Sequence, residues 1–324
     1  MEVWVSAKPY MLYEAVELLY AYVNEIPAGS LTQEGEYCLT EEAVQQMMDV
    51  ACAGVSRDDP AVRYYFGRHI ISEEPQRATC MARNLAYNTM TPSKGNMDED
   101  CAEICALRRV QRKSGQRPSA INEYRIFYTG ATDNAFLPIA QDIARLGVDE
   151  EYSQMLLEQF SGFDDAVEQL KAIIAPVAAE LEPLLLPWAQ LAEPLARIWE
   201  AHYSQPDAVE TWCKRVRYRE DKPLEAMRVQ LRYLRPKLAL GMVLEYKAFC
   251  HIGVAVPVVK PETETFQQWE YQALRLLGSE ARMRMLWAML DKPMSARELA
   301  QQLDMHLGVV CRDLGNLFNS RLSR

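Results

Sequence analysis

The spacing of apolar residues divides most of the chain into amphipathic helices. From Met11 to Val23 these residues recur at intervals of three and four, which is the repeat of one helix face. Thr40 with Glu41 and Glu42 behind it predicts a helix start, because a threonine hydroxyl can cap free N–H groups and acids favour the positive end of the helix dipole. We expect further helices over residues 40–53, 59–70, 76–89, 97–114, 133–146 and 149–160.

Two regions depart from this pattern. Residues 164–202 keep the helical spacing but contain prolines, which remove backbone donors, so we expect a kinked or divided helix. Apolar and polar residues alternate over 227–234, which is the repeat of a half-buried strand whose arginines face solvent. Residues 2–6 and two segments around Lys247 are expected to complete one small sheet.

The C-terminal segment has the pattern of a helix, a turn and a helix. Ser295 and Glu298 have the spacing of a capping box, in which each side chain bonds the backbone N–H of the other residue. Asp304 occupies the turn, where a left-handed backbone is expected and aspartate tolerates it. Residues at i, i+4 and i+7 form the apolar stripe of the second helix: Val310, Leu314 and Leu317.

A change of composition separates this segment from the rest. Residues 257–266 combine two prolines with Glu and Thr and fit neither repeat, so we interpret them as a linker. Two short helices are expected next, over 269–277 and 283–290. The predicted fold is mainly α with a small β-sheet. Its domains are a helical body over 1–260, for sensing and dimerisation, and a helix-turn-helix domain over 266–324.

Charge is unevenly distributed along the 324 residues. The net charge is −10, yet eight bases and six acids from Phe266 onward give that segment +2 and leave −12 for the preceding residues. This asymmetry allows the C-terminal segment to approach phosphate, although +2 is a weak electrostatic footprint. The eight cysteines have no regular spacing and are interpreted as free, mostly buried thiols. We find no secretory signal and expect no membrane span, so a cytoplasmic location is predicted.

The C-terminal motif resembles a known family. LGSEARMRML followed by SARELAQQLDMHLGVVCRDLGNL is similar over about 50 residues to the ArsR-like winged helix-turn-helix regulators. The resemblance implies a dimeric bacterial-type transcription regulator whose second motif helix enters the major groove of DNA. His306 would then cap that helix. The expected DNA-binding residues are Ser295, Arg297, His306, Leu307, Gly308, Val309, Arg312, Asn316, Arg321 and Arg324.

The sequence departs from that family in two ways. Base readout needs donors and acceptors, and among the residues at the start of the helix Leu307 and Val309 offer none; Arg312 and Asn316 are the strongest candidates. The family continues into a two-stranded wing, whereas eight residues follow Asn316 here. We therefore expect weak, largely sequence-independent binding, with Arg321 and Arg324 meeting phosphate.

Three functional hypotheses follow. The first is a transcription regulator whose body dimerises and binds a small-molecule effector. The second is a degenerate helix-turn-helix that serves protein contact or dimerisation without DNA. The third is an enzyme in the body; it has little support, because we find no phosphate loop, nucleophile elbow or zinc-protease motif. No cofactor is expected, and Cys101 with Cys105 supplies only two ligands for a metal.

Two basic regions and a set of aromatics have simpler interpretations. The bases over 108–117 and over 214–237 are interpreted as solvated faces, with an anionic ligand or partner as the alternative. Several aromatic residues are candidates for an effector pocket, although core packing is the favoured use: Tyr64, Tyr65, Phe66, Tyr124, Phe127, Tyr128, Trp188 and Trp199.

Overall fold

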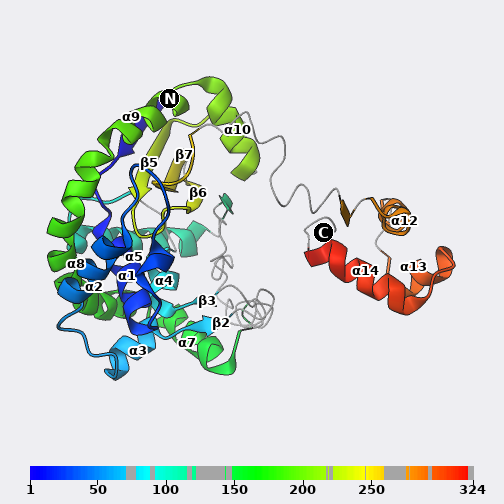
Figure 1. The fold of residues 1–324 in the computed structure, drawn as a ribbon, viewed down its shortest axis with the longest axis horizontal. Helices are drawn as coiled ribbons and strands as arrows, with labels where there is room; N and C mark the ends of the chain where they lie inside the picture. The colour runs from blue at the N-terminus through cyan, green and yellow to red at the C-terminus, as the bar shows by residue number, and fades with distance from the viewer. Residues whose placement is uncertain are drawn as a thin grey trace. The chain divides into compact units, whose positions relative to one another are not determined.

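The computed structural model in Figure 1 is mainly helical with one five-stranded sheet and a two-stranded ribbon. It forms two compact units, which we call unit 1 (Met1–Val258) and unit 2 (Val259–Arg324) and describe separately. The residues that the structure describes are 1–70, 78–87, 92–114, 119–121, 143, 148–216, 218, 222–244, 246–258, 275–276, 278–290 and 294–319.

Unit 1 is built around helix α1 (Met11–Val23). Every residue of α1 from Leu12 to Ala21 is buried, because other elements cover this helix on all sides. The long helix α8 (Phe163–Leu191) packs against both α1 and α2 (Glu41–Ala51). The predicted start of α2 is confirmed, since the Thr40 hydroxyl accepts a hydrogen bond from the Ala43 N–H at 3.2 Å.

The remaining helical bounds modify several predictions. The helix expected over 59–70 ends at Phe66, and His69–Ile70 forms strand β2, paired with β3 (Ala78–Thr79). The helix expected over 76–89 is limited to Met81–Ala86, and the one expected over 133–146 lies outside the described residues except for Ile143. The other helical elements of unit 1 are η1 (Ala28–Leu31), α3 (Pro60–Phe66), α4 (Met81–Ala86), α5 (Met97–Ser114), α7 (Glu150–Ser161), α9 (Glu193–Tyr203) and α10 (Pro206–Val216).

The proline-containing segment is divided once, as expected of a divided helix. The break lies at Ala192, between α8 and α9, just before Pro194. The three prolines inside α8 do not end the helix, and all three are exposed: Pro176, Pro183 and Pro187. Helix α10 was not predicted, because its buried face has few members, chiefly Trp212 and Val216.

The predicted sheet is confirmed and extended by one strand. Its order is β1-β5-β7-β6-β4, in which the first three strands are parallel and the other pairings antiparallel. Val3 lies opposite Met227 and Val5 opposite Val229, which places the N-terminal strand beside the predicted alternating strand. The strands are β1 (Glu2–Ser6), β4 (Ser119–Ile121), β5 (Ala226–Arg232), β6 (Ala239–Leu244) and β7 (Lys247–Gly253).

Two close contacts on this sheet require glycine. A Cβ at Gly241 would lie 2.7 Å from the Trp212 ring, so α10 can pack closely against β6. A Cβ at Gly253 would lie 2.1 Å from the Pro236 carbonyl oxygen, which no side chain can accommodate without a backbone shift. Helix α9 packs against β1, on the edge of the sheet (Figure 1).

Helix α8 bears on the expectation that no membrane span is present. It is the one helix among the described residues that is long and apolar enough to cross a membrane. Its inward side, including Leu170, Ile174 and Leu181, is buried in unit 1, and 33% of its most apolar stretch is buried in all. One such helix is weak evidence for a membrane span.

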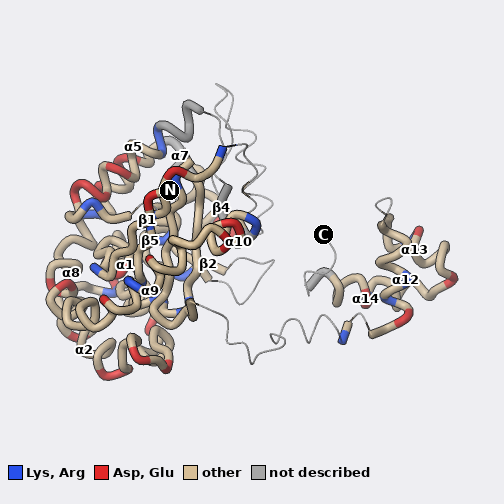
Figure 2. The backbone as a smooth tube through the Cα atoms, turned by 90° about the horizontal axis from the view of Figure 1, so that it is seen from above, with Lys and Arg blue, Asp and Glu red and all other residues tan. Residues whose placement is uncertain are grey.

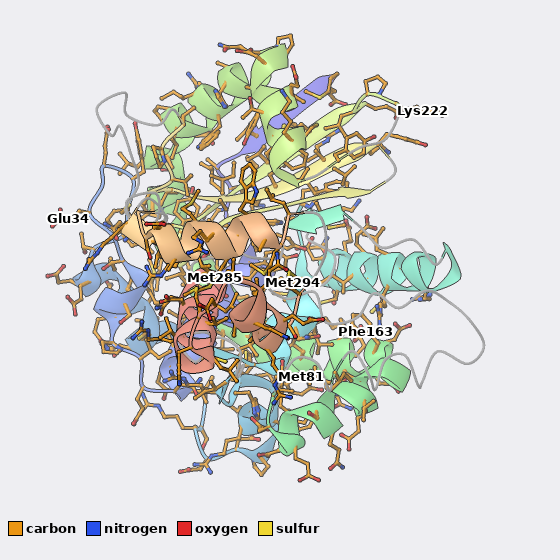
Figure 3. All side chains as sticks on the ribbon, turned by 90° about the vertical axis from the view of Figure 1, so that its right-hand side faces the viewer. Glu34, Met81, Phe163, Lys222, Met285 and Met294 are labelled. Atoms are coloured by element: carbon orange, nitrogen blue, oxygen red, sulfur yellow. The ribbon has the colours of Figure 1, made fainter. Side chains whose placement is uncertain are left out.

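Unit 2 contains α12 (Glu280–Ala288), α13 (Ala296–Gln302) and α14 (Leu307–Asn319) around a small core. The core residues are Met285, Leu299, Ala300 and Val310, and Figure 3 shows Met285 and Met294 among these helices. The expected linker over 257–266 and the helix over 269–277 lie mostly outside the described residues.

The inward side of α12 differs from the predicted stripe. Trp287 and Leu290 are 76% and 69% exposed and Met283 is also exposed, whereas Met285 is fully buried. Apolar residues surround this helix, so their spacing could not identify the inward side.

Candidate functional site

The candidate nucleic-acid interface begins at the predicted capping box. The Ser295 N–H donates to a Glu298 carboxylate oxygen at 2.7 Å, and the Glu298 N–H donates to the Ser295 hydroxyl at 3.3 Å. Both halves of the motif are present, so the first turn of α13 is held from both sides. The prediction of the box is confirmed, and it leaves the Ser295 side chain engaged by Glu298.

The turn between α13 and α14 has the expected conformation. Asp304 has φ +51°, in the left-handed region, and Met305 packs against the unit 2 core. His306 precedes α14, and its Nδ1 accepts a hydrogen bond from the Gly308 N–H at 3.1 Å. The geometry therefore agrees with the expected capping role of His306, which fixes the start of the helix.

Helix α14 separates its residues into two sides. Val310 and Leu317 are fully buried and Leu314 packs against the core, so the predicted stripe is confirmed as the inner side. We call the opposite side the outer face of α14. Half-buried Asn316 follows at i+9, and the exposed members recur at i, i+1, i+4, i+5 and i+8: Leu307, Gly308, Cys311, Arg312 and Gly315.

An ion pair fixes the orientation of this face. The guanidinium of Arg282 on α12 donates twice, at 3.2 Å, to one carboxylate oxygen of the buried Asp313 on α14. The neighbouring Arg312 is 69% exposed, and its Nε lies 3.7 Å from the same oxygen. Asp313 is thus held chiefly by Arg282, and the charge of Arg312 is presented to solvent.

The structure brings together only part of the expected DNA-binding set. Arg312 and Asn316 share the outer face, but only Arg312 is exposed; Asn316 and Val309 are both half-buried. Arg297 is exposed on α13. Arg321 and Arg324 lie outside the described residues.

The outer face is low in charge and in side-chain bulk. Most of α14 in Figure 2 is neither acidic nor basic, in keeping with the weak footprint expected from the sequence. A Cβ at Gly315 would meet nothing within 4 Å, so the glycine is not required for packing within the described chain. The backbone of α14 is therefore accessible at Gly315.

A buried charged network in unit 1 was not predicted. Glu14 and Glu17 on α1 are fully buried, and so is Arg232 at the end of β5. The expectation that the strand's arginines face solvent is therefore wrong for Arg232. Its side of the strand is covered by α1, whose carboxylates provide the countercharge; the available signal was a pair of acids within an otherwise apolar helix.

Glu14 binds the end of β5. The Nε of Arg232 donates to a Glu14 oxygen at 2.8 Å, and the backbone N–H groups of Tyr233 and Leu234 donate to the same carboxylate at 3.2 and 2.9 Å. The Nη2 of Arg232 donates to the Tyr87 hydroxyl at 2.9 Å. These contacts join segments that are far apart in the sequence.

Glu17 binds a second set of donors. Arg83 of α4 donates to it through Nε at 3.1 Å and through Nη2, the Tyr87 hydroxyl donates at 2.7 Å, and Arg235 lies 3.4 Å away. Burial raises the pKa of Glu17, but Arg83 and Arg235 outweigh that effect and hold the pKa at about 2. Glu17 is therefore ionised at neutral pH and locks α1 to α4.

One of the bases over 108–117, which were expected to form a solvated face, is also buried. Arg108 is 3% exposed, and its guanidinium lies 5.4 Å from the centroid of the Phe163 ring. Arg109 is exposed and pairs with Asp164 at 3.3 Å. The solvated-face interpretation of this segment is therefore wrong for Arg108, which packs between α5 and α8.

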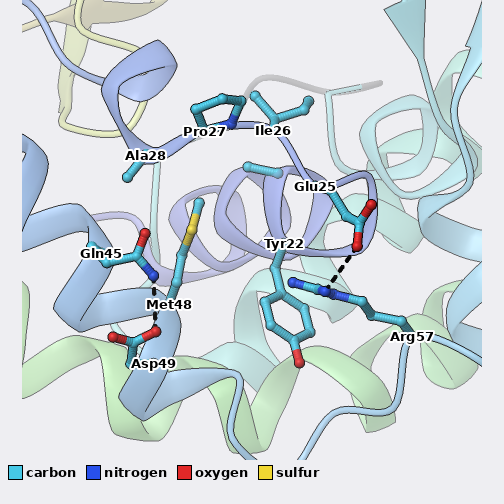
Figure 4. Close-up of a pocket in the computed structure, with 10 residues that line it drawn as sticks. Tyr22, Glu25, Ile26, Pro27, Ala28, Gln45, Met48, Asp49 and Arg57 are labelled. Atoms are coloured by element: carbon cyan, nitrogen blue, oxygen red, sulfur yellow. Dashed lines mark hydrogen bonds and ion pairs between the residues drawn. The ribbon is translucent and has the colours of Figure 1, made fainter.

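A hollow of about 250 Å³ lies between the end of α1, η1 and α2. Figure 4 shows the residues that line it. Arg57 lies 4.2 Å above the Tyr22 ring and pairs with Glu25 at 3.1 Å, while the Gln45 amide donates to Asp49 at 2.8 Å. The polar groups of the rim thus bond chiefly to one another, and the hollow supports no effector assignment. Of the aromatic candidates, Tyr65, Phe66 and Trp199 are buried core residues, while Tyr124, Phe127 and Tyr128 lie outside the described residues.

All eight cysteines are free, as predicted. Six are buried, Cys213 is half-buried and Cys311 is exposed on the outer face of α14. Burial raises the pKa of Cys101 and of Cys105 to about 12, which disfavours the thiolate that a metal would need. Within the described ranges, no group of three His, Cys, Asp or Glu side chains is placed to hold a metal ion.

Comparison with family models, curated proteins and solved structures gives no match for this chain.

Proposed function

We propose that the chain is a DNA-binding transcription regulator that contacts DNA through the outer face of α14. The observation that carries the proposal is the combination of a capped α13, a left-handed turn and an α14 that exposes Arg312 opposite its apolar stripe, with half-buried Asn316 beyond it. A helix presented in this way fits the width of the DNA major groove.

The chemistry of the face determines the expected mode of binding. Arg312 supplies one strong donor group for phosphate or guanine, and Asn316 supplies a donor and an acceptor about one turn further along. Gly308 and Gly315 add no donors, so few base contacts are available. We infer that affinity comes mainly from phosphate contacts, and that binding is weakly sequence-specific and weakens with salt.

In this proposal unit 1 provides dimerisation and effector sensing, in a cytoplasmic protein without a cofactor. Two copies would present two α14 helices to successive grooves, and an effector would change how well they fit. Exposed Trp287, Leu290 and Leu307 favour the second candidate function, a protein-contact module that does not bind DNA.

A gel-shift titration of the full chain with a random-sequence DNA duplex separates the two functions. Binding that weakens steeply between about 50 and 200 mM salt, and that Arg312→Ala reduces, supports DNA recognition. Lys214→Ala is the matched control, because Lys214 is an equally exposed base on unit 1. An absence of binding at low salt would refute the proposal in favour of protein contact.

A further inference from the structure

Helices α8 and α9 carry an exposed apolar surface on unit 1, along the edge of the fold in Figure 1. Leu186, Leu191 and Ile198 are 38%, 47% and 49% exposed, although they follow the same helical path as buried Leu181, Leu185 and Trp199. Four exposed prolines lie on the same side: Pro176, Pro183, Pro187 and Pro194. We call this the α8–α9 outer face.

The prolines make this surface rigid as well as apolar. A proline inside a helix costs about 3 kcal/mol relative to alanine. On a solvent-exposed face the three prolines of α8 would destabilise the helix without a compensating contact. Their rings lose little conformational entropy when they are covered. Both properties suit a contact surface.

Three pairs of exposed residues on this face are equally spaced along the sequence about a point between Trp188 and Ala189. Leu186 and Leu191 are equally distant from that point, as are Pro183 and Pro194. A third pair, Glu180 on α8 and Arg197 on α9, is also equally distant from that point along the sequence. Apart from the exposed Gln190 the pattern is apolar at the centre, and it is oppositely charged at the two ends.

Such a pattern is complementary to itself. An antiparallel copy related by a twofold axis at the central point would place its Leu191 against Leu186 and its Arg197 against Glu180, and each pair would occur twice. Both charged residues are exposed, and neither forms an ion pair with another described residue of its own chain. They are therefore available to a second copy.

We propose that the α8–α9 outer face is the surface through which two copies of this chain associate, in antiparallel orientation about that axis. The apolar centre supplies the burial, and the two Glu180–Arg197 pairs set the orientation and register. This surface lies wholly in unit 1. A dimer that binds no DNA would therefore contradict the proposed function and leave the interface intact.

Sedimentation equilibrium of the full chain with exchanged charges tests this interface. Glu180→Arg and Arg197→Glu should each weaken dimerisation about tenfold, because each creates two like-charge contacts, and the double variant should restore it. Leu186→Arg should abolish the dimer. Val50→Arg, at an exposed apolar residue of α2, is the matched control and should leave the dimer unchanged.

Three results would overturn the interface. They are a wild-type chain that is monomeric throughout the micromolar range, single charge variants that dimerise normally, and a double variant that fails to recover. A monomer that pellets with phosphatidylcholine vesicles would instead assign the apolar face to a lipid surface. Circular dichroism of each variant verifies that unit 1 remains folded.

Discussion

Substitution of Glu17 by glutamine tests the role of the buried network in unit 1. The change keeps the size of the side chain but removes the charge that faces Arg83 and Arg235. It therefore leaves Glu14 as the one carboxylate of the described network, opposite the guanidinium of Arg232. The substitution leaves the charges of Arg83 and Arg235 without their countercharge. We therefore expect the free energy of unfolding to fall by about 3–5 kcal/mol at neutral pH.

The acid dependence provides a second and more specific magnitude. The pKa of Glu17 is about 2 in the folded chain, against an ordinary value of 4.5. A carboxylate with a lowered folded pKa contributes stability above the unfolded pKa, and this contribution is lost as the pH falls toward the folded pKa. With these two pKa values, Glu17 contributes about 3 kcal/mol to the free energy of unfolding at pH 7. About 2 kcal/mol of this contribution is lost between pH 7 and pH 3.

Urea denaturation at pH 7 and pH 3, followed by circular dichroism, measures both quantities. Between pH 7 and pH 3 the free energy of unfolding of the wild type should fall by about 2 kcal/mol more than that of Glu17→Gln, because the glutamine cannot titrate. Glu25→Gln is the control, since Glu25 also pairs with an arginine, Arg57, but is exposed. Equal losses for the wild type and Glu17→Gln would refute the assignment of Glu17 as an ionised, buried anchor.

Three further substitutions test local packing. Met285→Ala should cost unit 2 about 2–5 kcal/mol by opening its small core, which hydrogen exchange of α13 and α14 would detect, whereas exposed Met283→Ala should leave exchange unchanged. Gly253→Ala should destabilise unit 1 by about 1–3 kcal/mol in urea because its Cβ meets a carbonyl oxygen, whereas Gly54→Ala meets nothing within 4 Å and serves as its control. Ser295→Ala should cost about 1 kcal/mol in thermal unfolding of unit 2, and restoration by threonine would attribute that cost to the cap.

Local signals predicted local structure well. Thr40 and the Ser295–Glu298 box start helices where expected, because the atoms that cap a helix belong to residues within three positions of each other. Asp304 adopts the expected left-handed conformation, because the tolerance for it belongs to the aspartate residue itself. The alternation over 227–234 located β5 correctly, since the repeat reflects backbone geometry.

The failures arose where distant segments decide the environment. The alternation placed Arg232 on a solvent face, but α1 covers that face and supplies Glu14. Met285 could not be separated from exposed Trp287 as the inward residue of α12, because only the positions of α13 and α14 distinguish them. Of the candidate interface, the sequence indicated the polar residues of α14 but not the ion pair from Arg282 that orients them.

Alkylation of Cys311 locates DNA on the chain directly. Cys311 lies between Gly308 and Arg312 on the outer face of α14 and is the one exposed cysteine of the eight, while half-buried Cys213 of unit 1 is an internal reference. The rate of maleimide modification of each thiol is measured by mass spectrometry, with and without a saturating random-sequence duplex at low salt. The proposed function predicts that DNA slows modification of Cys311 and leaves the rate at Cys213 unchanged. An unchanged rate at Cys311, under conditions in which a gel shift shows DNA bound, would contradict recognition through α14.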